Sequence, residues 1–226
     1  MGFYSIAIDG PSGAGKSTIA KRIAKQLGYI YVDTGAMYRA MALYFLRNNI
    51  KPTEKEKLEE ACKEVDISIR YVDGEQQVLL GDENVNAFIR AEEVGKMASN
   101  CSINPNVRIK LVELQRKLAA KENVVMDGRD IATHVLPNAN LKIYLTASSS
   151  IRAKRRYDEL MNKGIDCNFD EIEADIIDRD YRDMNRDISP LRQAEDAILV
   201  DSSEMTLDEV TDKIISLFSE NVEVIE

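Results

Sequence analysis

Short apolar runs alternate with amphipathic stretches along this chain of 226 residues. The runs have the length and continuous hydrophobicity of strands buried on both faces. After most of them, apolar residues recur at three- and four-residue spacing, which is typical of a helix. Such alternation predicts an α/β fold, a five-stranded parallel sheet with helices on both faces. The expected strands cover residues 4–9, 29–33, 123–127, 141–146 and 197–201.

Helix boundaries are indicated by capping residues. Thr34 stands where an N-cap is expected, before a helix that should run to about residue 49. Residues 53–56 (Thr-Glu-Lys-Glu) and 206–209 (Thr-Leu-Asp-Glu) have the capping-box pattern at the start of two further helices. Pro105 fits the first position of another helix.

The apolar period changes from helical to alternating between residues 67 and 80. Ile67, Ile69 and Tyr71 alternate with polar residues, and Asp73-Gly74 then separates them from a second short run. This pattern predicts a β-hairpin. We therefore expect a small α+β insertion over residues 65–101, closed by a helix that begins near residue 92.

Composition favours a cytoplasmic protein that acts on small molecules. No apolar run reaches transmembrane length, and no signal segment opens the chain. The three cysteines have no metal-binding spacing, which fits free thiols in a reducing compartment. A net charge of −9 argues against a general nucleic-acid binder. With no long heptad run, a monomer is expected.

The first expected strand leads into a glycine-rich loop with the pattern of a P-loop, followed by an amphipathic helix. Its glycines let successive backbone N–H groups point at phosphate oxygens, and the helix directs its positive end at the same anion. Lys16 would reach the β- and γ-phosphates of a nucleotide, and Ser17 would bind Mg²⁺. The nucleotide-phosphate site, which would be the ATP site of a kinase, is expected to comprise Gly10, Pro11, Ser12, Gly13, Ala14, Gly15, Lys16, Ser17 and Thr18.

A P-loop predicts nucleotide binding but does not specify the reaction. The chain lacks the Asn-Lys-x-Asp motif of GTPases. Several arginines could bind a second phosphate or cover the transferring group, as phosphoryl transfer requires. Candidates for the second phosphate site are Arg39, Arg108 and Arg129. Candidates for covering the transferring group are Arg152, Arg155 and Arg156, which share one face of an expected helix.

Four segments in this order resemble the bacterial cytidylate kinase family. They are residues 10–18 (GPSGAGKST), 33–39 (DTGAMYR), 127–130 (DGRD) and 179–186 (RDYRDMNR). The first is shared by many nucleotide-binding proteins, whereas the other three are much more specific. The resemblance extends from the first strand to the last helix and includes the hairpin.

The resemblance implies transfer of a phosphoryl group from ATP to CMP or dCMP, with Mg²⁺. It places Thr34 in the monophosphate pocket and Arg39, Arg129 and Arg186 around the acceptor's phosphate. Ser99, Arg108 and Asp130 resemble the residues that read cytosine, while Arg179 and Asp183 resemble those that contact the sugar. Asp127 belongs to the same CMP-binding segment. Lys16, Arg129, Arg152, Arg155 and Arg156 are expected to act in catalysis.

The family's organisation would divide the chain into three parts. The P-loop core would comprise residues 1–64, 102–147 and 185–226, with the monophosphate-binding insertion at 65–101 and a helical lid with the following helix at 148–184. Another small-molecule P-loop kinase and a nucleotide-dependent switch remain alternatives. Ala132 departs from the family's usual glycine, and alanine would be strained there if the position required positive φ.

Overall fold

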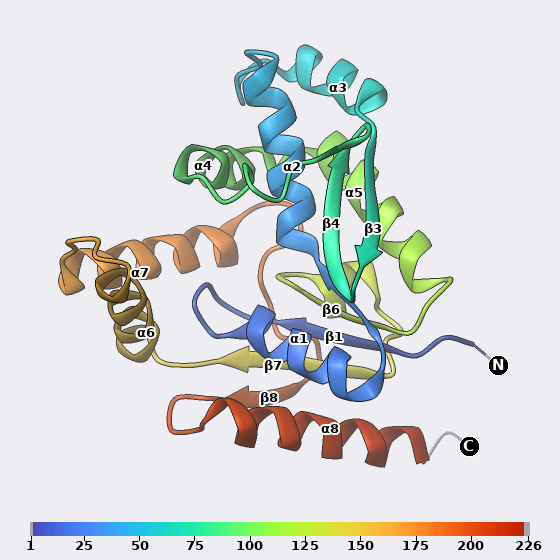
Figure 1. The fold of residues 1–226 in the computed structure, drawn as a ribbon, viewed down its shortest axis with the longest axis vertical. Helices are drawn as coiled ribbons and strands as arrows, with labels where there is room; N and C mark the ends of the chain where they lie inside the picture. Colours follow the sequence, from blue (N-terminus) through green and yellow to red (C-terminus); the bar gives the residue numbers. More distant parts are fainter. Residues whose placement is uncertain (1, 224–226) are drawn as a thin grey trace. The chain divides into compact units, whose positions relative to one another are not determined.

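A computed structural model describes residues 2–223 of the chain (Figure 1). The elements follow in the order β1 (Ser5–Asp9), α1 (Lys16–Leu27), β2 (Ile30–Asp33), α2 (Thr34–Arg47), α3 (Lys55–Glu64), β3 (Ile67–Val72), β4 (Glu75–Leu80), β5 (Glu83–Asn84), α4 (Glu92–Cys101), α5 (Pro105–Ala119), β6 (Val124–Gly128), the π-helix η1 (Ile131–Val135), β7 (Leu141–Thr146), α6 (Ser149–Asn162), α7 (Phe169–Asn185), β8 (Ile198–Asp201) and α8 (Leu207–Glu223).

Five strands form a sheet in the order β2-β6-β1-β7-β8. β1 pairs in parallel with β6 and β7, and β7 pairs in parallel with β8. The parallel sheet with flanking helices predicted from the apolar runs is therefore confirmed. The carboxyl ends of such strands are where α/β proteins bind ligands, and β1 and β6 end side by side at Asp9 and Gly128.

By its contacts the chain divides into two compact units, residues 1–31 with 123–226, and residues 32–122. We call them unit 1 and unit 2. The sequence predicted a division by role instead, into a P-loop core, an insertion and a lid. That division stays a prediction.

Unit 1 is built on the central strands of the sheet. α1 packs on β1 and β6 and also contacts α8, which packs on β7. Ile6, Ile8, Ile143 and Leu145 are fully buried in this core. Continuous apolar strands suit such burial because both faces of a parallel sheet are covered. α6 and α7 pack against each other.

Unit 2 contains the hairpin predicted from the alternating pattern. β3 and β4 pair antiparallel around Asp73 and Gly74, which both have positive φ, as a two-residue hairpin turn requires. β5 adds a short third strand. α2 contacts α4 and α5, and α3 contacts α5.

Helix capping corrects two expectations and confirms a third. Asp33, not Thr34, is the N-cap of α2, and its side chain accepts a hydrogen bond from the Ala36 N–H. α3 has no side-chain cap at Glu54, so the capping box predicted at residues 53–56 is absent. In the box before α8, Thr206 and Glu209 bond each other's backbone N–H as expected.

Ala132 lies inside the π-helix and is not among the residues with positive φ. The strain considered for alanine at this position is therefore absent. Within residues 2–223, no helix is long and apolar enough to cross a membrane.

Candidate functional site: a P-loop and two arginine sets

The glycine-rich loop between β1 and α1 adopts the conformation of an anion-binding loop. Gly10 lies so close to β7 that an added Cβ would be 1.9 Å from the Leu145 carbonyl oxygen, so only glycine fits. α1 begins at Lys16 after a left-handed Gly15 that provides no side-chain cap. The first N–H groups of α1 thus have no capping side chain and can bind an anion.

Lys16 curls back over this loop, and its Nζ donates a hydrogen bond to the Pro11 carbonyl oxygen at 2.7 Å. Its side chain is buried. Burial, followed by the Arg129 cation, lowers the pKa of Lys16 to about 7, while Asp127 and Asp9 act in the opposite direction. A polyphosphate at the loop would favour the charged amine.

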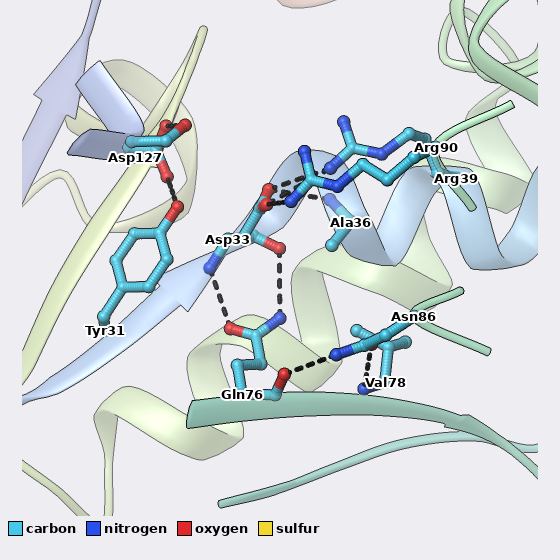
Figure 2. Close-up of polar contacts among 10 residues, drawn as sticks. Tyr31, Asp33, Ala36, Arg39, Gln76, Val78, Asn86, Arg90 and Asp127 are labelled. Atoms are coloured by element: carbon cyan, nitrogen blue, oxygen red, sulfur yellow. Dashed lines mark hydrogen bonds and ion pairs between the residues drawn. The ribbon is translucent and has the colours of Figure 1, made fainter. Parts of the chain in front are cut away.

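Ser17 and Asp127 join the P-loop to the end of β6. The Ser17 hydroxyl donates to Asp127 Oδ2 at 2.9 Å, and the Tyr31 hydroxyl donates to Asp127 Oδ1 at the same distance. Figure 2 shows Tyr31 reaching Asp127. A hydroxyl beside a carboxylate is the donor pair that Mg²⁺ prefers when phosphates and water complete its shell. Nothing in the sequence pattern pointed to Tyr31.

Residues that the sequence assigned to the acceptor gather after β6. Arg129 Nε donates to Asp183 Oδ2 at 2.8 Å, and Arg186 lies 3.7 Å from Asp130 Oδ1. Burial by itself raises the pKa of Asp183, but the guanidinium groups of Arg129, Arg179 and Arg186 together outweigh it and the pKa is lowered. Arg179, which lies on α7 together with Asp183 and contributes to lowering the pKa of Asp183, has an exposed side chain.

Asp9 holds the loop that carries Asp130, a role that the sequence did not reveal. Its two carboxylate oxygens accept hydrogen bonds from the backbone N–H groups of Ile131 (2.9 Å) and Ala132 (2.8 Å). Burial raises the pKa of Asp9 to about 7 although both hydrogen bonds favour the ionised form. The residue before the P-loop thus fixes the start of the π-helix.

The three lid arginines have different surroundings and do not gather as one cluster. Arg152 is buried; it pairs with Asp180 at 2.7 Å and donates to the Ser12 carbonyl oxygen in the P-loop at 2.8 Å. Arg155 donates to the Ser202 carbonyl oxygen, and Arg156 pairs with Glu159 in solvent.

Unit 2 contains the remaining predicted acceptor residues. Thr34 is buried at the start of α2, and Ser99 is half-buried on α4. Arg39 pairs with Asp33 at 3.1 Å. Arg108 is buried on α5 and donates to the Tyr38 hydroxyl at 3.3 Å. Arg90, which the sequence reading did not select, pairs with Asp33 as well.

Comparisons with solved structures support the fold. A gluconokinase from Sinorhizobium meliloti matches with a TM-score of 0.52 and 14% identity, over 98% of this chain and 95% of that one. A protein of unknown function from Eubacterium ventriosum matches with a TM-score of 0.54 and 16% identity, over 96% and 98% of the two chains.

Sequence comparisons are far more specific. The cytidylate kinase of Caldicellulosiruptor bescii is 52% identical over 95% of both chains. That of Bacillus subtilis is 47% identical over 93% of this chain and 94% of its own. The family model described as cytidylate kinase matches residues 6–220. The resemblance of the four motifs is thereby confirmed over nearly the whole length, and this chain belongs to the cytidylate kinase family.

Proposed function

We propose that this chain transfers the γ-phosphoryl group of ATP to CMP or dCMP, giving ADP and CDP or dCDP in pyrimidine nucleotide metabolism. The observation that carries the proposal lies at the end of β6. There Asp127 contacts Ser17 of the P-loop, and Arg129 and Asp130 follow directly with their ion-pair partners. In the proposed reaction, the end of β6 therefore contributes residues both to the site of the phosphoryl donor and to the site of the phosphoryl acceptor.

The donor is ATP, bound by residues 10–18. Backbone N–H groups of the loop and the start of α1 bind its phosphates. Lys16 exchanges its hydrogen bond to Pro11 for one to the β- and γ-phosphates. Ser17 and Asp127 would hold Mg²⁺, which neutralises phosphate charge when it is bound.

The acceptor is a cytosine nucleotide. Arg39, Arg129 and Arg186 bind its phosphate, and Arg179 and Asp183 contact its sugar. Asp130 accepts a hydrogen bond from the exocyclic amine of cytosine, while Ser99 and Arg108 donate to the ring O2 and N3. Uracil has a carbonyl in place of the amine, so Asp130 would face another acceptor. A buried unpaired polar group costs about 1–3 kcal/mol.

In the transfer, an oxygen of the acceptor's phosphate forms a bond to the γ-phosphorus. The bond from that phosphorus to the bridging oxygen breaks, and its electron pair leaves with ADP. Charge spreads over the equatorial oxygens, so positioned cations contribute more than an acid/base pair. Lys16 and Arg129 supply such cations, with Arg155 and Arg156 approaching when residues 148–170 close as a lid. Arg152 of the same segment already lies against the P-loop, where it donates to the Ser12 carbonyl oxygen. Closure also excludes water.

The experiment is an acceptor panel with ATP and Mg²⁺, comprising CMP, dCMP, UMP, AMP, GMP, shikimate and gluconate. We expect CMP and dCMP to be phosphorylated with the highest kcat/KM. Good turnover of another member without turnover of CMP would contradict the proposal. CMP should also raise Tm without ATP, which a nucleotide-dependent switch with no acceptor site would not show.

The three thiols are free, which supports the cytoplasm as the proposed location. A monomer remains the proposed state in solution.

A further inference from the structure

We propose that Arg90 is a second guanidinium ligand of the acceptor nucleotide's phosphate, acting beside Arg39. This inference rests on the proposed function and deepens it. It starts from the carboxylate of Asp33, on which both arginines converge in unit 2 (Figure 2).

Asp33 lies at the end of β2 and is the N-cap of α2. Its Oδ1 accepts from the Ala36 N–H at 2.8 Å, and its Oδ2 lies 3.1 Å from Arg39 Nη2 and 3.3 Å from Arg90 Nη2. The Asp33 side chain is only 11% exposed, whereas those of Arg39 and Arg90 are 22% and 67% exposed. The carboxylate is thus at the base of the cluster, and the guanidinium groups form its outer rim.

The cluster concentrates positive charge around one carboxylate. Two guanidinium groups contact Asp33, and the positive end of α2 lies at the same place. In the described part of the chain, Asp33 is the one hydrogen-bond partner of the Arg90 side chain. The remaining donors of the planar Arg90 guanidinium can therefore bind a further anion, and a phosphate monoester fits that geometry.

A fixed carboxylate makes this arrangement a preorganised site. Gln76 of β4 holds the backbone of Asp33: its Oε1 accepts from the Asp33 N–H at 2.8 Å, and its Nε2 donates to the Asp33 carbonyl oxygen at 3.4 Å. Asn86 in turn donates to the Gln76 carbonyl oxygen and accepts from the Val78 N–H. The hairpin thereby sets the position of Asp33, which orients both arginines before the ligand arrives.

The test compares CMP with cytidine, which lacks only the phosphate, by calorimetric titration of the whole chain. Arg90→Gln should weaken CMP binding about tenfold, the size expected for one charge-assisted hydrogen bond. It should leave cytidine binding unchanged. In steady-state kinetics, KM for CMP should rise while KM for ATP stays within about twofold.

Arg70→Gln is the matched control. Arg70 is an exposed arginine on β3 in the same unit, and its side chain donates a hydrogen bond to Gln77 on β4. Its loss removes the same charge without removing a hydrogen bond to Asp33. It should leave both affinities unchanged. Arg90→Lys keeps the charge without the fork and should give an intermediate loss for CMP.

Unchanged CMP affinity in Arg90→Gln would overturn the inference, and so would an equal loss for CMP and cytidine. An equal loss in Arg70→Gln would also overturn it, since the effect would then be one of net charge. A wild-type chain that binds CMP but does not phosphorylate it would refute the proposed function while leaving the Arg90 comparison valid.

Discussion

Arg152 of α6 and Asp180 of α7 form an almost fully buried ion pair, with 2.7 Å between Nη2 and Oδ2 and side chains that are 6% and 12% exposed. Arg152 also donates to the Ser12 carbonyl oxygen, and a Cβ added to Gly13 would lie 3.3 Å from the Arg152 Cβ. The pair therefore connects α6 of the expected lid and the helix that follows it, α7, to the backbone of the P-loop. Arg152 thus supports the P-loop backbone in addition to any contact with phosphate.

Removing the buried partner should be costly. Asp180→Ala leaves the Arg152 cation buried without its counter-charge, so we expect a loss of about 3 kcal/mol in the free energy of unfolding. Asp178→Ala on the same helix removes an exposed pair with Arg182 and should cost less than about 0.5 kcal/mol. Urea unfolding measures both, and equal losses would contradict the role given to the buried pair.

The buried carboxyl of Asp9 should make stability depend on pH. Its pKa is raised from 3.8 to about 7 in the fold by burial, with Asp130 raising it further and Lys16 opposing; Tyr144 also faces it. Between these values the folded state keeps a proton that the unfolded chain has lost. The contribution of the protonated Asp9 carboxyl to the free energy of unfolding is complete below pH 3.8. It is lost as pH rises through 7, and the free energy of unfolding falls by at most about 1.4 kcal/mol per pH unit.

Asp9→Asn does not titrate and provides the reference. Wild-type minus variant unfolding free energy, measured from pH 4 to 8, should therefore fall as pH rises. A difference that stays flat over this range would show that Asp9 ionises normally in the fold.

Substitution of Arg129 by lysine should lower catalytic activity with little effect on thermal stability. Arg129→Lys keeps a cation for Asp183, so Tm should remain within about 3 °C of wild type. Because an ammonium cannot reproduce the planar fork, kcat/KM for CMP should fall at least about tenfold. Thermal unfolding and steady-state kinetics on the same preparation test both expectations. Arg129→Ala should lose stability as well as activity, because Asp183 is then left without the cation of residue 129. Full activity in the lysine variant would argue that Arg129 is structural.

Gln76 should act as a positioning residue. Gln76→Ala removes both hydrogen bonds to the Asp33 backbone, which should cost about 1 kcal/mol in unfolding free energy and raise KM for CMP more than KM for ATP. Gln77→Ala, the next residue on β4, removes only the contact with exposed Arg70 and serves as the control. Similar kinetics for the two variants would contradict the positioning role.

Ala132 offers a test of backbone conformation. Since its backbone is helical within η1, glycine should gain nothing from its freedom at positive φ and should lose conformational entropy. Ala132→Gly is therefore expected to lower the unfolding free energy by about 0.5–1 kcal/mol. A stabilised variant in chemical denaturation would mean that the position requires positive φ.

The sequence by itself determined the elements whose cause is local. Continuous apolar runs predicted the five strands, because strands buried on both faces must be apolar throughout. Asp73-Gly74 predicted the hairpin, since both residues tolerate positive φ. The glycine and lysine spacing predicted the P-loop, and four motifs indicated the family. Capping was less predictable, because Asp33 and Thr34 are both good N-cap residues and only backbone geometry decides between them.

Only the tertiary structure decided which distant side chains meet. The parallel register pairs Ile8 with Asp127 and Asp9 with Gly128, which brings the end of β6 to the P-loop. From that register follow the contact of Ser17 with Asp127 and that of Asp9 with the π-helix, across more than 100 residues of chain. Arg90 joins Arg39 at Asp33 in the same way, through folding of the segments between them. Local sequence specifies the period and ends of an element, but strand register and helix packing depend on the burial of the whole core.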